Sequence, residues 1–209
     1  MTAEGASAPA GYAQCMVGRV IALAGTSSVG KSSVAARLQE ILPEPHLVVG
    51  IDHFFSMFPQ HWEDHPRGPG PGFWYEESAD PDGSPRSRIR YGVAGERLLA
   101  GMRASVRAML DCGNNVILDE MPVDSSIIPA WKRELASFHA YWVHLKAPLS
   151  VVEQREAGRT RGRQWGNARG HFGIADREDF DLVLDASSAA PGDIAAEIKR
   201  ASSAVAPHR

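Results

Sequence analysis

The sequence predicts a single α/β domain in three layers, with five parallel strands between two layers of helices. Short apolar runs that suit strands buried on both faces occur at residues 20–24, 47–51, 116–118, 141–145 and 182–184. Segments with apolar residues at helical spacing separate these runs, and such alternation is typical of a parallel sheet with crossover helices. Parallel sheets bind ligands at the carboxyl ends of their strands, so the residues that follow each run are the candidates for a site.

Length and composition fit one domain and exclude several classes of protein. The chain has 209 residues, of which 44% are hydrophobic and 22% charged, as in ordinary globular proteins. A net charge of −3 argues against a nucleic-acid-binding or membrane-binding surface. Cys15 and Cys112 are far apart, which indicates a reduced, cytoplasmic protein. Residues 1–18 lack the basic and apolar regions of a signal peptide, so we expect a flexible leader before a domain at 19–205.

The turn after the first strand carries the most specific motif in the chain. Residues 25–32 match G-x-x-x-x-G-K-[ST] at every fixed position, and apolar residues at helical spacing follow as far as Pro43. Glycines let the backbone approach an anion, and the amide groups of the turn and of the helix N-terminus then hold phosphate oxygens. The motif predicts a site for a nucleoside triphosphate, either ATP or GTP. Its expected binding residues are Gly25, Thr26, Ser27, Ser28, Val29, Gly30, Lys31, Ser32 and Ser33.

Polar residues in the motif and at two strand ends provide the expected metal site and catalytic groups. Lys31 would reach the β- and γ-phosphates, and the Ser32 hydroxyl would bind Mg²⁺. Asp119 follows the apolar run 116–118 and would support the same ion, although an acid at a strand end can also cap a turn. Asp52 follows the run 47–51 and could take the proton from an attacking hydroxyl. The alternative for Asp52 is a supporting role near Mg²⁺ or a loop cap.

Residues 53–90 differ from the rest of the chain because they are rich in proline, glycine and aromatic residues. An insertion of this length is usually functional or disordered, and the aromatic residues argue against disorder. We expect a loop, with or without a short hairpin, that folds over a ligand. The aromatic side chains form either a satellite of the core or the wall of an acceptor pocket. The expected substrate-binding residues are Asp52, Phe54, Phe55, Phe58, Trp62, Trp74, Glu120 and Met121.

An arginine-rich stretch at residues 155–171 follows the fourth strand and its helix. Charged residues on a helix are usually a solvated surface. Here, however, arginines alternate with glycines at the place where a mobile lid could close over the phosphates and neutralise their charge. Arg159 and Arg163 are the first choices for this catalytic role, and Arg155 and Arg161 are the next.

Several of these stretches together resemble the chloramphenicol phosphotransferases. The phosphate loop carries paired serines as in that family, and the segment from Leu-Pro-Glu-Pro at residues 42–45 to Gly-Ile-Asp at 50–52 is the most specific part of the resemblance. The other similar stretches are residues 116–120 with Trp131, residues 153–156 and residues 179–183. Together they span about residues 19–203.

The resemblance implies a nucleoside-monophosphate-kinase-like P-loop domain that transfers the γ-phosphate of a nucleoside triphosphate to a small molecule. It also implies that the acid matching Asp52 deprotonates the acceptor hydroxyl. Three features depart from the family. Arg161-Gly162-Arg163 lacks the acid of the family's Arg-Gly-Asp-Arg, Asp119-Glu120 stands in place of paired aspartates, and the insertion at 59–90 is longer and more aromatic.

The first hypothesis is therefore an ATP- and Mg²⁺-dependent O-phosphotransferase that inactivates a hydroxylated antibiotic such as chloramphenicol. The second is a kinase of another small metabolite or nucleoside on the same fold. The third is a nucleotide-dependent switch, which the absence of an Asn-Lys-x-Asp motif disfavours. The expected partners are a nucleoside triphosphate and a small hydroxylated substrate, without nucleic acid or membrane. The acceptor, the choice between ATP and GTP and the formation of a homo-oligomer stay open.

Overall fold

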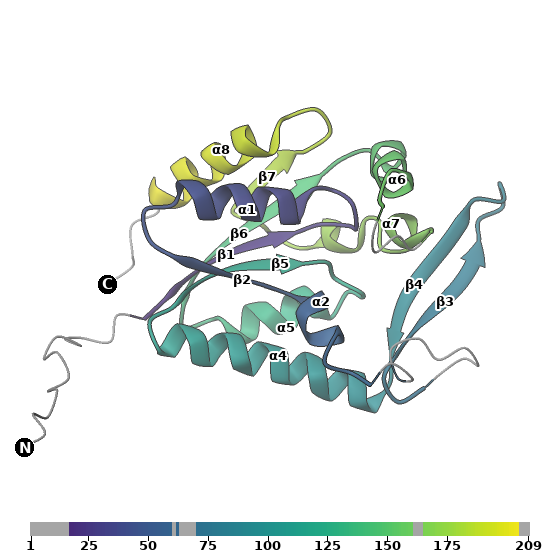
Figure 1. Cartoon of the computed structure of the whole chain (residues 1–209), viewed down its shortest axis with the longest axis horizontal. Coiled ribbons are helices and arrows are strands. Elements are labelled where there is room, and N and C mark those ends of the chain that lie inside the picture. Colours follow the sequence, from purple (N-terminus) through teal and green to yellow (C-terminus); the bar gives the residue numbers. More distant parts are fainter. Residues whose placement is uncertain (1–16, 60–61, 63–69, 161–164, 205–209) are drawn as a thin grey trace, which may run out of the picture.

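The computed structural model describes residues 17–59, 62, 70–160 and 165–204 (Figure 1). Its main sheet has five parallel strands in the order β2-β5-β1-β6-β7, which confirms the predicted fold class. The strands are β1 (Arg19–Ala24), β2 (His46–Gly50), β5 (Asn115–Glu120), β6 (His139–Lys146) and β7 (Leu182–Asp185).

Helices cover both faces of this sheet, as Figure 1 shows. Helices α1 (Lys31–Ile41) and α8 (Pro191–Ala204) lie on one face, and α4 (Val93–Asp111) and α5 (Ile127–Glu134) on the other. Helix α4 illustrates why the segments are helical: its buried residues Leu99, Met102, Val106 and Leu110 recur every three or four positions. It ends just before Gly113, which adopts the left-handed φ of 84° that is common after the last turn of a helix.

Two apolar clusters form the core, one on each face of the sheet. Successive side chains of a strand point to opposite faces, and β1 shows this directly. Val20, Ala22 and Ala24 belong to the cluster under α4 and α5. Ile21 and Leu23 belong to the cluster under α1 and α8. Burial on both faces explains why the strands read as continuous apolar runs in the sequence.

The insertion folds as a short helix and an antiparallel hairpin. Strand β2 ends at Gly50, so Asp52 lies in the first turn of α2 (Ile51–Phe55) instead of at the end of a strand. Strands β3 (Phe73–Ala79) and β4 (Pro85–Tyr91) form the hairpin, joined by a turn in which Gly83 has a φ of 81°. Residues 60–61 and 63–69 lie outside the described part of the chain.

The hairpin packs against α7 (Asn167–Gly170), which follows α6 (Leu149–Ala157) and precedes a 3₁₀ turn at Ile174–Arg177 (Figure 1). The backbone amide of Ser87 donates a hydrogen bond to the Gly166 carbonyl at 3.0 Å, and Arg88 Nε donates to the Gly170 carbonyl at 3.1 Å. The backbones are so close that a Cβ on Gly170 would lie 1.8 Å from the Ser87 carbonyl oxygen. The hairpin and α7 therefore form one structural unit.

Helices long and apolar enough to cross a membrane are absent from the described residues.

Candidate active site

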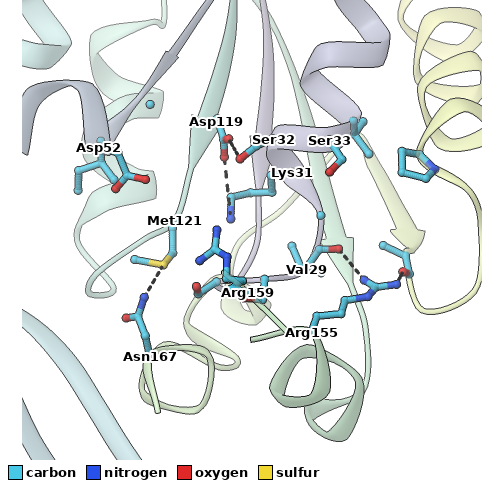
Figure 2. A pocket seen from close by; sticks show the side chains of 18 of the residues that line it. Val29, Lys31, Ser32, Ser33, Asp52, Asp119, Met121, Arg155, Arg159 and Asn167 are labelled. Carbon is cyan, nitrogen blue, oxygen red and sulfur yellow. Dashed lines mark hydrogen bonds and ion pairs between the residues drawn. The ribbon is translucent and has the colours of Figure 1, made fainter. Parts of the chain in front are cut away.

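The candidate site is a cavity of about 700 Å³ at the carboxyl ends of the parallel strands. The phosphate loop and the start of α1 form its floor, and α2, the hairpin, α6, α7 and the start of α8 contribute to its walls (Figure 2). The strand register explains the meeting of these segments, because Gly50 and Leu23 both pair with Asp119 across the sheet. The residues that follow β1, β2 and β5 consequently reach the same edge.

The phosphate loop has the backbone conformation that an anion site requires. Ser28 has a positive φ of 62°. Among the non-glycine residues that the structure describes, no other has a positive φ. Gly25 has a φ of 155°, and a Cβ at this position would lie 2.6 Å from the Leu145 carbonyl oxygen. Gly30, with a φ of 112°, caps the N-terminus of α1. Left-handed residues in such a turn aim successive amide groups into a concave site for phosphate.

Lys31 lies at the base of the cavity and is only 6% exposed. Its ammonium group donates to the carbonyls of Gly25 and Thr26, both at 3.0 Å, and lies 3.9 Å from an Asp119 carboxylate oxygen. Burial lowers the pKa of Lys31, while the nearby carboxylates, Asp119 first, act in the opposite direction. Phosphate oxygens can replace the two carbonyls as partners of this ammonium group.

Ser32 and Asp119 offer the oxygen ligands that Mg²⁺ prefers. The Ser32 hydroxyl donates to Asp119 Oδ2 at 2.6 Å, and both residues line the cavity. Within the described residues, no group of three or more His, Cys, Asp or Glu side chains could hold a metal ion. Mg²⁺ often takes one or two protein ligands and completes its coordination with phosphate oxygens and water. The hydroxyl–carboxylate pair therefore fits a nucleotide-bound Mg²⁺.

Asp52 and its neighbour His53 line the cavity at the first turn of α2. Asp52 is exposed, and Figure 2 shows it on the opposite side of Lys31 from Arg155. The Gly50 amide donates to His53 Nδ1 at 3.1 Å, which favours a ring that carries its proton on Nε2. The Asp52 carboxylate borders the same cavity as Lys31 and Asp119.

The arginines of the predicted lid differ in their surroundings. Arg159 is exposed, lines the cavity and is near enough to Lys31 to lower its pKa. Arg155 also lines the cavity, but its guanidinium group binds the backbone: it donates to the carbonyls of Val29 at 3.0 Å and Ala186 at 2.8 Å. Arg169 bridges Glu153 of α6 and Asp80 of the hairpin. Arg161 and Arg163 lie outside the described residues.

Most of the aromatic residues expected at the acceptor site pack away from the cavity. The Phe55 ring lies 3.9 Å from the Phe73 ring, centre to centre, and the Phe58 ring 5.5 Å from it. Phe54 also packs against the core under α4, and Trp62 contacts the ring of Phe58. The expected substrate residues that do not line the cavity are Phe54, Phe55, Phe58, Trp62, Trp74 and Glu120. Of the two interpretations of the aromatic cluster, these positions favour the satellite of the core.

Glu120 points into the protein beneath the site. It is 1% exposed, and Trp131 Nε1 donates to its Oε2 at 2.6 Å. Burial raises the pKa of this carboxyl to about 7. Its position distinguishes it from Asp119, which precedes it on the strand and faces the cavity.

The lining of the cavity includes four residues that were not among the expected substrate-binding residues. His53 follows the predicted base, while Tyr75 and Ile89 face each other across the hairpin in register. Asn167 comes from α7, and its Nδ2 donates to the sulfur of Met121 at 3.9 Å. Alternation along β3 and β4 would have found Tyr75 and Ile89 once the hairpin was assumed. Nothing local in the sequence marks Asn167.

Comparison with known families gives one match over most of the chain. Residues 18–203 match the family described as "Chloramphenicol phosphotransferase-like protein". The matched range covers the phosphate loop, the hairpin, α6, α7 and the last strand.

A curated relative and two solved structures agree with this match. The protein named "Putative O-phosphotransferase Rv2636" of Mycobacterium tuberculosis is 27% identical over 191 residues, which cover 87% of this chain and 80% of the relative. The structure of the M. tuberculosis APS kinase CysC in complex with AMPPNP and APS has a TM-score of 0.55 at 18% identity, covering 88% of this chain and 97% of that one. Shikimate kinase from Acinetobacter baumannii in complex with shikimate also has a TM-score of 0.55, at 17% identity, covering 88% of this chain and 93% of that one. At these identities the two structures establish the fold, which is that of P-loop kinases.

Proposed function

Because this chain belongs to the chloramphenicol phosphotransferase-like family and is thereby a small-molecule O-phosphotransferase, we propose that it transfers the γ-phosphate of ATP to an antibiotic of chloramphenicol type. Phosphorylation of a hydroxyl would inactivate the antibiotic and confer resistance. The reaction would take place in the cytoplasm, where ATP is available. GTP is a possible alternative donor, because a phosphate loop binds through backbone groups that do not distinguish the bases.

The observation that carries this proposal is the composition of one cavity. Lys31, Asp119 and Asp52 all line it, so a cation for the phosphates, a metal-binding carboxylate and a potential base border the same space. The relative in M. tuberculosis supports an O-phosphotransferase, and the complex of CysC with AMPPNP supports an adenine nucleotide as the donor.

The chemistry of the proposal follows from these positions. The oxygen of the acceptor hydroxyl attacks the γ-phosphorus, and the bond from phosphorus to the oxygen bridging the β- and γ-phosphates breaks. The hydroxyl proton passes to the Asp52 carboxylate, and ADP leaves with the bridging oxygen. Lys31 and Arg159 hold the phosphate oxygens as negative charge moves between them. Ser32 and Asp119 would hold Mg²⁺, whose positive charge neutralises the phosphates when it is bound.

The first test measures the transfer directly. Wild-type protein and the Asp52→Asn variant receive ATP, MgCl₂ and a panel of hydroxylated antibiotics that includes chloramphenicol, and mass spectrometry detects a phosphate-sized gain. Loss of a general base lowers turnover by about 10²–10⁴-fold, so we expect kcat of Asp52→Asn to fall by about 100-fold or more. Affinity for AMPPNP should stay within about twofold, because Asp52 lies outside the phosphate loop.

Asp179→Asn is the matched control, since Asp179 is exposed and does not line the cavity. Its turnover should equal that of the wild type. Unchanged turnover in Asp52→Asn would remove Asp52 from the mechanism. If the protein phosphorylates sugars or nucleosides but none of the antibiotics, it is still a phosphotransferase, and its acceptor is a metabolite.

A further inference from the structure

Asn167 has a buried polar atom at the acceptor end of the cavity. The residue is 9% exposed and lines the cavity. Its Oδ1 is buried and has no hydrogen-bond partner among the described residues. The orientation of the side-chain amide follows from its neighbour, because the sulfur of Met121 can accept a hydrogen bond from Nδ2 but cannot donate one to Oδ1. A buried carbonyl oxygen without a hydrogen bond costs free energy. This indicates that a group of a ligand donates a hydrogen bond to Oδ1.

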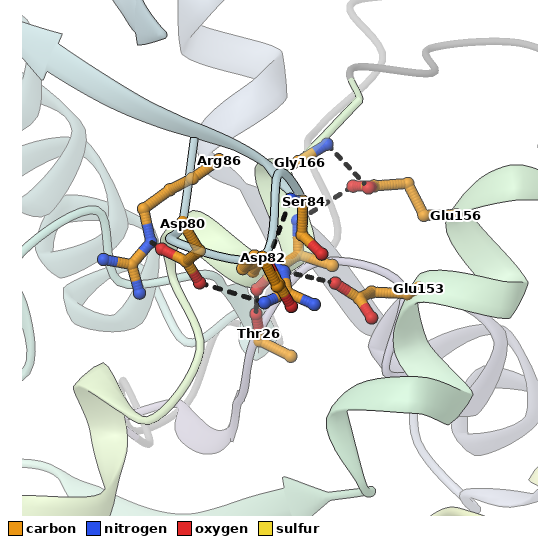
Figure 3. A network of polar contacts seen from close by, with 10 residues as sticks. Thr26, Asp80, Asp82, Ser84, Arg86, Glu153, Glu156 and Gly166 are labelled. Carbon is orange, nitrogen blue, oxygen red and sulfur yellow. Dashed lines mark hydrogen bonds and ion pairs between the residues drawn. The ribbon is translucent and has the colours of Figure 1, made fainter. Parts of the chain in front are cut away.

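The backbone around Asn167 is fixed by side chains from two other segments. The Glu156 carboxylate of α6 accepts hydrogen bonds from the amides of Gly166 at 3.0 Å and Ala168 at 2.8 Å, one on each side of Asn167 (Figure 3). His171 Nδ1 donates to the Asn167 carbonyl at 2.9 Å, and its Nε2 accepts from the Ile89 amide at 3.1 Å. Glu156 and His171 are themselves buried. The backbone that carries the Asn167 carboxamide is therefore held in place, as is required of a residue that recognises a ligand.

Asn167 shares its side of the cavity with the proposed base. Figure 2 shows Asp52 and Asn167 on the same side, with the Met121 side chain between them. Tyr75 and Ile89 also line the cavity. An acceptor that fills it can place one hydroxyl at Asp52 and a second polar group at Asn167, with its carbon skeleton against Met121.

We propose that Asn167 is a specificity-determining residue, which accepts a hydrogen bond through Oδ1 from a second hydroxyl or amide N–H of the acceptor molecule. The residue thereby selects acceptors that carry such a donor in addition to the hydroxyl that is phosphorylated. This inference rests on the proposed phosphotransfer, and it adds a chemical requirement that the acceptor must meet. Sites built to hydrogen-bond a substrate group can reject analogues without that group by about 10⁴-fold or more, because their buried polar atoms are then left unpaired.

The test uses matched pairs of acceptors. Chloramphenicol and a set of 1,3-diols are each compared with a partner that lacks one hydroxyl or carries an N-methylated amide. For the wild type we expect kcat/KM of at least one compound to exceed that of its partner by about 30-fold or more. Asn167→Leu, which has a similar shape and no polar atom, should bring this ratio to within about threefold, mainly through a higher KM for the preferred compound.

Two further variants and a binding measurement make the result specific. Asn167→Asp keeps an oxygen at the position of Oδ1 and should retain most of the ratio. If Asn167→Leu unfolds at a lower temperature than the wild type, Asn167→Ala is used in its place. Affinity for AMPPNP should change by less than about twofold in all three variants, because the proposed partner is the acceptor.

The outcomes separate the role of Asn167 from the proposed function. An unchanged ratio in Asn167→Leu, with chloramphenicol or a diol still phosphorylated, overturns the role of Asn167 and leaves the phosphotransferase intact. A loss of AMPPNP affinity as large as the loss for the acceptor also overturns it, because Asn167 would then bind phosphate. If the wild type phosphorylates no compound of either set, the proposed function fails and the role of Asn167 fails with it.

Discussion

Lys31 keeps its ammonium group inside the protein by pairing it with backbone carbonyls of its own phosphate loop. Three acidic residues, Asp119, Glu120 and Asp52, oppose the effect of burial on its pKa. A lysine held in this way does not have to be ordered when the nucleotide arrives, so less conformational entropy is lost on binding. The arrangement therefore prepares the site for a triphosphate before any is bound.

Glu120 leads to a prediction about pH. Burial raises the pKa of its carboxyl from 4.5 to about 7, so the folded protein binds this proton more tightly than the unfolded chain does. The contribution of Glu120 to stability is therefore complete below pH 4.5 and is lost as the pH rises towards 7. Glu120→Gln can still accept the hydrogen bond from Trp131 and does not ionise. We expect it to be more stable than the wild type at pH 8 by about 1–3 kcal/mol, and the difference should shrink towards pH 5.

Urea unfolding between pH 5 and pH 8 measures this difference. Glu40→Gln serves as the control, because Glu40 is exposed and pairs only with Arg37 on the surface of α1 among the described contacts. Its stability should follow that of the wild type at every pH. A constant difference between Glu120→Gln and the wild type across the range would show that ionisation of Glu120 is not the cause.

At this scale, the sequence predicts residues whose contacts are local. The phosphate loop is predictable because Gly25, Ser28 and Gly30 act through the conformation of a single turn. The position of Asn167 in the cavity is less predictable, since it depends on contacts of its backbone with Glu156 and His171, and of His171 with the hairpin. The aromatic residues of the insertion were expected either as a satellite of the core or as the wall of an acceptor pocket, and in the structure Phe55 and Phe58 pack against Phe73.

Among the elements, the hairpin depends most on distant segments. Its contacts with α7 join residues 82 positions apart in the chain, as between Arg88 and Gly170. Arg169 strengthens the contact by binding Asp80 of the hairpin at 2.9 Å and Glu153 of α6 at 2.6 Å. Figure 3 shows Asp80 and Glu153 in the same network of polar contacts. This part of the structure is therefore assembled from segments that are far apart in sequence.

A substitution at Gly170 should separate the hairpin from α7. A Cβ there would lie 1.8 Å from the Ser87 carbonyl oxygen, and this backbone atom can move only with the strand. We expect Gly170→Ala to lower the free energy of unfolding by about 1–3 kcal/mol and to speed hydrogen exchange in β3 and β4. Urea unfolding and amide exchange by mass spectrometry measure the two effects.

Gly101→Ala is the matched control in helix α4, where a Cβ would contact nothing within 4 Å. It should raise the free energy of unfolding by about 0.5–1 kcal/mol, because alanine loses less entropy than glycine in a helix. If Gly170→Ala behaves like Gly101→Ala, the close packing between the hairpin and α7 is not needed for stability.

The elements themselves were predictable to different degrees. Each of the five parallel strands is an apolar run, so all five were expected and all five are present. The hairpin stayed open as an alternative, because it packs against α7, which lies about 80 positions further along the chain. Residue patterns show burial well, whereas they do not show which distant element a strand packs against.

In the whole molecule, the sheet brings residues from separate parts of the chain to one edge. Ser32 lies at the start of α1 and Asp119 near the end of β5, and their side chains meet at 2.6 Å. A ligand that binds this edge is in contact with segments throughout the fold. Binding should therefore stabilise the entire domain and not only the loop that touches the phosphates.

Thermal unfolding with AMPPNP provides the corresponding prediction. At a ligand concentration 100 times Kd, the stabilisation is about 2.7 kcal/mol, which should appear as a higher unfolding temperature. We expect the shift with MgCl₂ to exceed the shift with EDTA, because Ser32 and Asp119 fit a metal bound to the phosphates. Asp119→Asn should reduce the difference between MgCl₂ and EDTA. Equal shifts with MgCl₂ and EDTA in the wild type would contradict this assignment of the metal site.

Helix α6 has a consequence for how the chain can vary in length. Three of its residues within four positions bind other segments. Glu153 binds Arg169, which also contacts the hairpin, and Arg155 binds the phosphate loop. Glu156 binds the start of α7. One inserted residue in this helix would rotate everything after it by about 100°, so the three attachments could not all be kept. The turn around Gly83 has no such constraint, since space around that glycine is open. In homologous chains, insertions should therefore be common at the hairpin tip and rare in α6.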